Sequence, residues 1–86
     1  MKLKAGPWDG AQPRTHVLKV LKKHGVEVNK LREDWYELVD LDGDPVVLLV
    51  PNPVPSEIVV HIYRRFGEIH DFPITALRAP KPKTVH

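Results

Sequence analysis

The sequence predicts an α+β fold in the order helix, three strands, helix, with a three-stranded antiparallel sheet that carries both helices on one face. Three observations support this fold class. Residues 14–24 have apolar side chains at helical spacing, two apolar stretches flank the Asp42-Gly43 pair, and residues 56–66 begin and end like a helix. An Asp-Gly pair between stretches rich in β-branched and aromatic residues is a strong hairpin signal.

The composition describes one small domain without a covalent staple. The chain has 86 residues, of which 42% are hydrophobic and 28% charged, and it contains no cysteine. Disulfides and cysteine-based zinc sites are therefore excluded, and a reducing cytoplasm is the expected location. The first residues lack the apolar run of a signal peptide or a membrane span. We expect no membrane association, no cofactor and no metal.

Proline and glycine divide the chain into three regions. Residues 1–13 contain two prolines and two glycines without helical or alternating periodicity, and are expected to form a loosely attached N-terminal arm that Trp8 can pin to the domain. Residues 14–75 form the predicted domain. Residues 76–86 are a basic tail spaced by prolines, which favours an extended backbone.

The first helix is predicted at residues 14–24. Its apolar stripe consists of Val17, Leu18 and Leu21. Thr15 is expected to cap the N-terminus, and Gly25 to end the helix in a left-handed conformation.

Three strands are predicted after this helix. They lie at residues 26–28, 35–41 and 46–50, with a polar turn at residues 29–34 between the first two and the Asp-Gly turn at residues 42–44 between the last two. Alternation places Trp35, Glu37, Val39 and Leu41 on one face of the second strand.

The third strand, Val46 to Val50, has five consecutive apolar residues, and such a run implies burial on both faces. Two helices cover only one face. We therefore expect the other face to be covered by a second copy of the chain as the first choice, or by residues 1–13, residues 69–74 or another protein.

The second helix is predicted at residues 56–66. Ile58, Val59, Val60 and Ile62 also suit a strand, so the ends decide. Pro55-Ser56-Glu57 is typical of a helix start, Arg64 and Arg65 suit a last turn, and Gly67 suits a left-handed end. Beyond it, Ile69, Phe72 and Ile74 alternate with polar residues and are expected to lie against the domain.

Residues 15–67 resemble the HicA-type toxins of bacterial toxin–antitoxin pairs. The matching features are residues 17–26 as a first helix with a glycine stop, the Asp42-Gly43 turn, and the Val50-Pro51 step before the last helix. The resemblance implies a double-stranded-RNA-binding-like fold. It also implies that the protein binds or cleaves mRNA, and that an antitoxin covers the active surface.

The chain departs from this family at the catalytic position. The family has a histidine in a Gly-X-His step on its second strand, where this chain has Glu33-Asp34-Trp35. No catalytic residue is therefore assigned, and carboxylates at this position would repel RNA phosphates. We expect a non-catalytic protein; a ribonuclease that uses a relocated histidine, such as His61, is the alternative.

Neither histidines nor aspartates form a ligand pattern. The five histidines (His16, His24, His61, His70 and His86) include no pair at a spacing of three or four, so ordinary surface or helix-end positions are expected. Asp40, Asp42 and Asp44 lack the downstream glutamate of a calcium loop. Turn formation explains these aspartates.

Charge is segregated along the chain, and two classes of function follow. Residues 33–57 hold seven acidic residues and no Lys or Arg, whereas the rest hold 13 basic and four acidic residues. A nucleic-acid-binding module, for RNA or DNA, would use the basic residues Lys19, Lys22, Lys23, Arg64, Arg65, Lys81 and Lys83. A protein-interaction module would instead use the acidic, aromatic sheet surface at Trp35, Tyr36 and Glu37.

Overall fold

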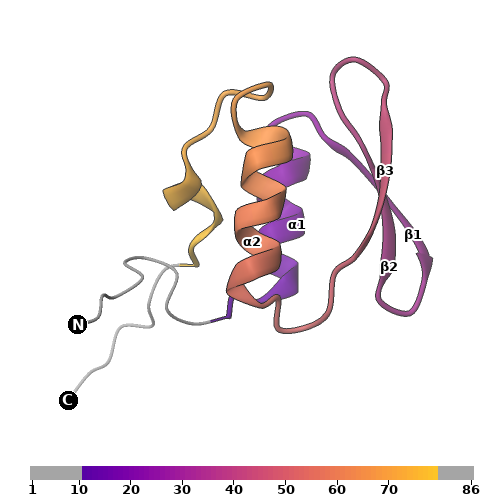
Figure 1. Cartoon of the computed structure of the whole chain (residues 1–86), viewed down its shortest axis with the longest axis vertical. Coiled ribbons are helices and arrows are strands. Elements are labelled where there is room, and N and C mark those ends of the chain that lie inside the picture. The colour runs from indigo at the N-terminus through magenta and orange to yellow at the C-terminus, as the bar shows by residue number, and fades with distance from the viewer. Residues whose placement is uncertain (1–10, 80–86) are drawn as a thin grey trace.

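The predicted order of elements is confirmed in the computed structural model, which describes residues 11–79. Two helices pack side by side against one face of a three-stranded antiparallel sheet (Figure 1). No helix among residues 11–79 has the length and apolar character needed to cross a membrane. The elements are α1 (Arg14–Lys23), β1 (Glu27–Arg32), β2 (Trp35–Val39), β3 (Pro45–Leu49), α2 (Ser56–Ile62), the π-helix η2 (Tyr63–Gly67) and the 3-10 helix η3 (Ile74–Leu77).

α1 forms on the predicted apolar stripe and buries Val17, Val20 and Leu21. Its predicted cap at Thr15 is wrong, because the helix starts one residue earlier and follows Pro13 without a side-chain cap. The predicted end is confirmed. Gly25 has φ +94°, and the N–H of the next residue donates to Leu21 O, which satisfies a terminal carbonyl.

The sheet has the order β1-β2-β3. The predicted β2–β3 hairpin is confirmed, with Val39 opposite Pro45, but β2 ends two residues earlier than predicted and the loop at residues 40–44 is longer than the predicted turn at 42–44. β1 is longer than predicted and includes four of the six residues of the expected polar turn. Its exposed polar residues lie on an edge strand, and pairing with β2, such as Asn29 opposite Glu37, extends the strand to Arg32.

β3 is not buried on both faces within the described part of the chain, so that expectation is wrong there. Val46 and Leu48 face the helices and are half-buried, whereas Val47 and Leu49 point to the other side and are exposed. Apolar side chains of β3 are therefore exposed on the face of the sheet opposite the helices.

The second helix begins at the predicted residue but changes its winding. α2 follows Pro55 without a side-chain cap, so the predicted cap at Ser56 is wrong. After Ile62 the chain forms the π-helix η2. Gly67 has no left-handed conformation, contrary to expectation. It is needed for a different reason, because a Cβ at this position would overlap the Tyr63 ring.

Residues 68–79 pack on the helix side of the molecule, away from the sheet (Figure 1). Phe72 is buried and Ile74 half-buried, as predicted, but Ile69 is 39% exposed. This segment does not cover the outer sheet face, so that alternative is wrong. Leu77 is fully buried, and the Ala79 N–H donates to Gln12 Oε1 at 2.8 Å.

The packed domain thus extends beyond the predicted bounds, residues 14–75, at both ends. Ala76 and Leu77, assigned to the tail, pack in or against the core, and Gln12, assigned to the arm, pairs its backbone with Val54. Trp8 and residues 80–86 lie outside the described range. The core fills the space between helices and sheet with Val17, Val20, Leu21, Val26, Tyr36, Leu38, Val50, Val54, Val59, Ile62, Phe66, Phe72 and Leu77.

Candidate binding surface

The outer face of the sheet, on the side opposite the helices, exposes large apolar side chains. Trp35 on β2 lies opposite Leu49 on β3, and Glu37 lies opposite Val47. Trp35 is 41% exposed, Val47 56% and Leu49 39%. Aromatic and aliphatic residues that adjoin one another on a surface are typical of protein interaction sites. We call Trp35, Glu37, Val47 and Leu49 the outer sheet face.

Strand alternation decides which predicted residues share this face. Trp35 and Glu37 lie on it, whereas Tyr36 points to the helices and is only 6% exposed. The inclusion of Tyr36 in the exposed protein-binding set is therefore corrected. Glu37 is held in place by Asn29, whose Nδ2 donates to Glu37 Oε1 at 3.2 Å.

Arg14 on α1 binds the open end of the β2–β3 hairpin. Its Nη1 donates to Asp34 Oδ1 at 2.8 Å and to Val50 O at 3.2 Å, and its guanidinium lies 5.7 Å from the centre of the Tyr36 ring. One side chain from α1 thus contacts the residue before β2 and the residue after β3, the two strands that carry the outer sheet face. Trp35 directly follows Asp34, the residue that Arg14 binds, so the contact fixes the backbone next to Trp35.

β3 also offers an open edge, because among residues 11–79 it pairs with β2 alone. The Val50 N–H donates to Asp34 O, and Asp44 O accepts from the Asp40 N–H. Along an antiparallel strand, the backbone N–H and C=O groups of successive residues point alternately to the two sides. The backbone groups of the even-numbered residues of this segment therefore point toward β2. The backbone groups of Val47 and Leu49 therefore point to the open edge.

The aspartates of the β2–β3 turn are explained by turn formation, as predicted. Asp40 is buried, and its Oδ1 accepts the N–H groups of Asp42 at 2.9 Å and Asp44 at 3.1 Å. Their carboxylate oxygens lie within 4.8 Å of one another, but hydrogen bonding within the turn accounts for this proximity. Asp42 and Asp44 leave their own carboxylates exposed beside β3.

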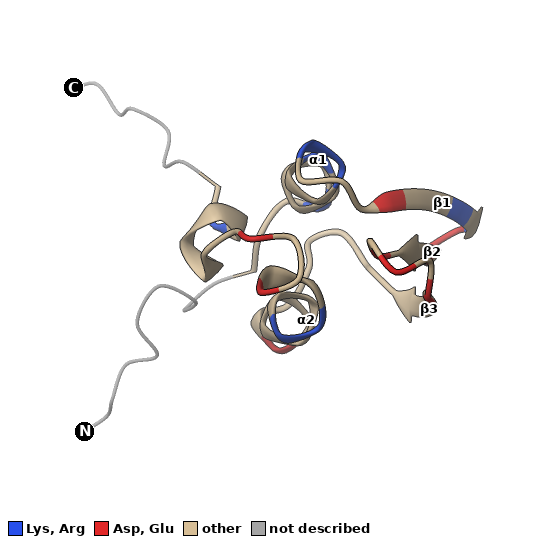
Figure 2. Cartoon of the chain, turned by 90° about the horizontal axis from the view of Figure 1, so that it is seen from above, with Lys and Arg blue, Asp and Glu red and all other residues tan. Residues whose placement is uncertain are grey.

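The predicted nucleic-acid-binding residues within positions 11–79 come from α1 and from η2, which follows α2. α1 and α2 run in the same direction, so Lys22, Lys23 and Arg64 lie near the same end of the helix pair (Figures 1 and 2). Arg65 is held differently, with its Nη2 3.7 Å from Asp40 Oδ2. Lys19 lies about one turn before Lys22 and Lys23 on α1 and lines the pocket described below, and Lys81 and Lys83 lie outside the described residues.

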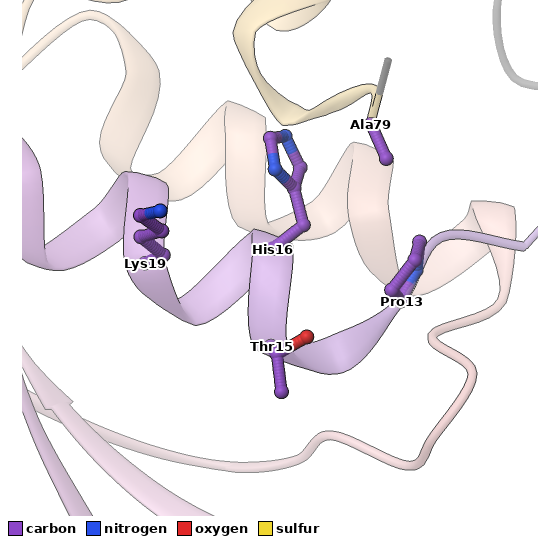
Figure 3. A pocket seen from close by; sticks show the side chains of 5 residues that line it. All are labelled: Pro13, Thr15, His16, Lys19 and Ala79. Carbon is purple, nitrogen blue, oxygen red and sulfur yellow. The ribbon is translucent and has the colours of Figure 1, made fainter. Parts of the chain in front are cut away.

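This open pocket has a volume of about 340 Å³ and is lined by Pro13, Thr15, His16, Lys19 and Ala79 (Figure 3). His16 points toward the C-terminal segment, with its Nε2 3.1 Å from Ala76 O. The histidine therefore holds this segment against α1. Lys19 is the other titratable residue among those that line the pocket.

His70 differs from the expectation that histidines occupy ordinary surface or helix-end positions, because it is buried. Its Nε2 accepts the Leu41 N–H at 3.2 Å, and its Nδ1 lies 2.8 Å from His24 O. Because Nε2 accepts a hydrogen bond and Nδ1 faces a carbonyl oxygen, the ring proton lies on Nδ1. The ring links three segments of the fold, so its role is structural.

Trp35, which the predicted resemblance to HicA-type toxins places where the family has its catalytic histidine, lies on the exposed side of β2. His61, the suggested alternative, is exposed on α2, the layer behind the sheet. No family model, curated protein or solved structure matches this chain. The resemblance to HicA-type toxins remains a prediction from residues 15–67.

Proposed function

We propose that this protein is a non-catalytic interaction module that binds another polypeptide through its outer sheet face. The observation that carries the proposal is the cluster of exposed apolar side chains at Trp35, Val47 and Leu49. A side chain such as tryptophan dominates many protein interfaces, because it buries a large area with little loss of conformational freedom.

The surroundings of this face favour a protein over a nucleic acid. Glu37 lies within it, and Asp42 and Asp44 flank β3. Phosphates would be repelled by these carboxylates, whereas a polypeptide can offer apolar and basic side chains together. Within the HicA-like interpretation, the family's catalytic face becomes a surface that only binds.

An affinity experiment with nuclease-treated lysate tests the proposal. Three baits are compared: the natural chain, the Val47→Ser/Leu49→Ser variant, and a control with Leu31→Ser, which removes an apolar side chain that is 52% exposed on β1. We expect a protein partner that the natural chain and the control retain and the double variant loses. A partner set that is the same for all three baits would contradict the proposal.

Nucleic-acid binding is the second candidate. It is favoured by one observation, the common end of α1 and α2 that carries exposed Lys22, Lys23 and Arg64. Lysines and arginines that lie together attract phosphates at low salt. RNA or DNA that is retained by the double Ser variant but lost with Lys22→Glu/Lys23→Glu would support this candidate instead.

A further inference from the structure

We propose that the partner of the outer sheet face is an extended segment with alternating apolar and basic residues, which adds to the open edge of β3 as a fourth strand. This inference rests on the proposed function and names the chemistry of its partner. A strand added to a sheet edge gains affinity from backbone hydrogen bonds and specificity from alternate side chains.

The backbone of β3 is suited to this mode of binding. Val47 and Leu49 each present an N–H and a C=O group toward the open edge, because their neighbours Val46 and Leu48 bond to β2. Pro45 has no N–H and offers only its carbonyl. An incoming strand thus finds two donors and three acceptors at alternate positions along the edge.

The two edges of the sheet differ in how they are protected. β1 carries Glu27, Lys30 and Arg32 and has a register irregularity before Arg32. Charges and bulges of this kind discourage strand addition. The five residues of β3 carry no charge, and their only protection is the proline at its first position. Strand addition is therefore expected at β3 and not at β1.

Charge selects the kind of segment. The hairpin contributes Glu37 on the outer face and the exposed Asp42 and Asp44 at the start of β3. None of these carboxylates forms an ion pair with a residue between positions 11 and 79. Apolar side chains of the segment would pack beside Val47 and Leu49, and its Lys or Arg residues would meet the carboxylates.

The same charges argue against a second copy of the chain at this edge, which the sequence suggested as the first choice. Two β3 strands related by a two-fold axis would place two acidic hairpins side by side. Each hairpin carries the carboxylates of Glu37, Asp42 and Asp44, which are not ion-paired within residues 11–79, and has no Lys or Arg between residues 35 and 49. A second copy would bring no Lys or Arg on its own hairpin to meet these carboxylates, so a basic segment fits the edge better.

A synthetic peptide, acetyl-Lys-Leu-Lys-Val-Lys-Leu-amide, serves as the probe with the full chain. Amide hydrogen exchange measured by NMR is the direct readout, because strand addition engages the amides of Val47 and Leu49. We expect saturating peptide to slow exchange at these two amides at least tenfold and to leave those of β1 unchanged. A peptide with glutamate in place of each lysine is the matched control and should have no effect.

One double variant tests the charge requirement without altering the hairpin, and a variant on β1 is its control. In Asp42→Asn/Asp44→Asn, the backbone N–H groups that bond Asp40 remain. The double variant should bind the peptide at least about threefold more weakly at low salt, since each exposed ion pair contributes modestly. Leu31→Ser on β1 should bind as the natural chain does.

Other outcomes overturn the inference and identify the alternative. Protection of the two amides without peptide that rises with protein concentration would identify a second copy as the occupant. Protection without peptide at every concentration would identify a segment of the chain itself. No protection with peptide would exclude strand addition, while the affinity experiment with the Ser variants would still test the proposed function independently.

Discussion

Asp40 and Arg65 join the β2–β3 turn to the end of the second helix. Asp40 Oδ2 is buried and has no hydrogen bond, and its charged partner is the Arg65 guanidinium, with Nη2 3.7 Å away. The other carboxylate oxygen organises the turn itself. The pair therefore holds the hairpin, and with it the outer sheet face, against the helix layer.

Replacing Arg65 with methionine should destabilise the fold. The substitution keeps most of the aliphatic volume but leaves the buried Asp40 carboxylate without a charged partner. We expect a loss of about 1–3 kcal/mol in the free energy of unfolding, in the range for an unsatisfied buried polar group. Urea denaturation monitored by circular dichroism measures this loss.

Arg64→Met is the matched control, because Arg64 is the adjacent exposed residue. It should change the free energy of unfolding by no more than about 0.5 kcal/mol. In the double variant Asp40→Asn/Arg65→Met, the losses should not add, since the charge that needed a partner is gone. Equal effects of the Arg64 and Arg65 variants would contradict the structural role.

His70→Phe should also destabilise the fold although it preserves an aromatic ring. The variant leaves the Leu41 N–H and the His24 carbonyl without their partner. Each of these part-buried hydrogen bonds contributes about 0.5–1.5 kcal/mol. Thermal unfolding should show a clear fall in Tm, whereas His61→Phe, at an exposed helix position, should leave it nearly unchanged. A similar Tm for both variants would show that the two contacts contribute little.

The features predicted from the sequence are those determined by neighbouring residues. The β2–β3 hairpin follows from Asp42-Gly43 and the alternation on either side, and the end of α1 follows from Gly25. Strand alternation likewise puts Trp35 and Glu37 on one face of β2, although it does not give the side of the sheet on which the helices lie. These signals are local, so a single sequence displays them.

The missed features depend on residues that are distant in sequence. β1 extends to Arg32 because β2 pairs with it, although its own residues are polar. His70 is buried because two backbone groups, 46 and 29 positions away, bind its ring. Leu77 is an isolated apolar residue whose burial depends on α1 and η2. No local periodicity announces such positions.

Gly67→Ala should be destabilising, for a reason that a second substitution removes. The added methyl group would overlap the Tyr63 ring, which packs edge-on against Phe72 with ring centroids 6.4 Å apart. Overpacking of this kind costs about 1–3 kcal/mol. On a Tyr63→Ala background, where the ring is absent, Gly67→Ala should have almost no further cost. Denaturant midpoints of the four proteins measure the coupling, and additive losses would contradict it.

The protein should not cleave RNA. In the predicted resemblance to HicA-type toxins, Trp35 would stand at the position of the catalytic histidine, and an indole is neither an acid nor a base near neutral pH. Mixed transcripts incubated with purified protein should stay intact on a denaturing gel. Cleavage that disappears with His61→Ala would overturn this prediction and identify a relocated catalytic histidine.

If the protein binds RNA, the exposed end of the helix pair should carry the contact, and salt dependence reveals it. Lys22, Lys23 and Arg64 are free of ion pairs within residues 11–79, whereas Arg65 is engaged with Asp40. Each phosphate contact adds about 0.7–0.9 to the slope of log affinity against log salt. Fluorescence anisotropy with a labelled RNA at several salt concentrations should therefore give a shallower slope for Lys22→Gln/Lys23→Gln. Lys30→Gln on β1 is the charge-matched control for one of these changes and should keep the natural slope. Affinity that is indifferent to salt would exclude phosphate recognition by this end of the helices, because counterion release accompanies every such contact.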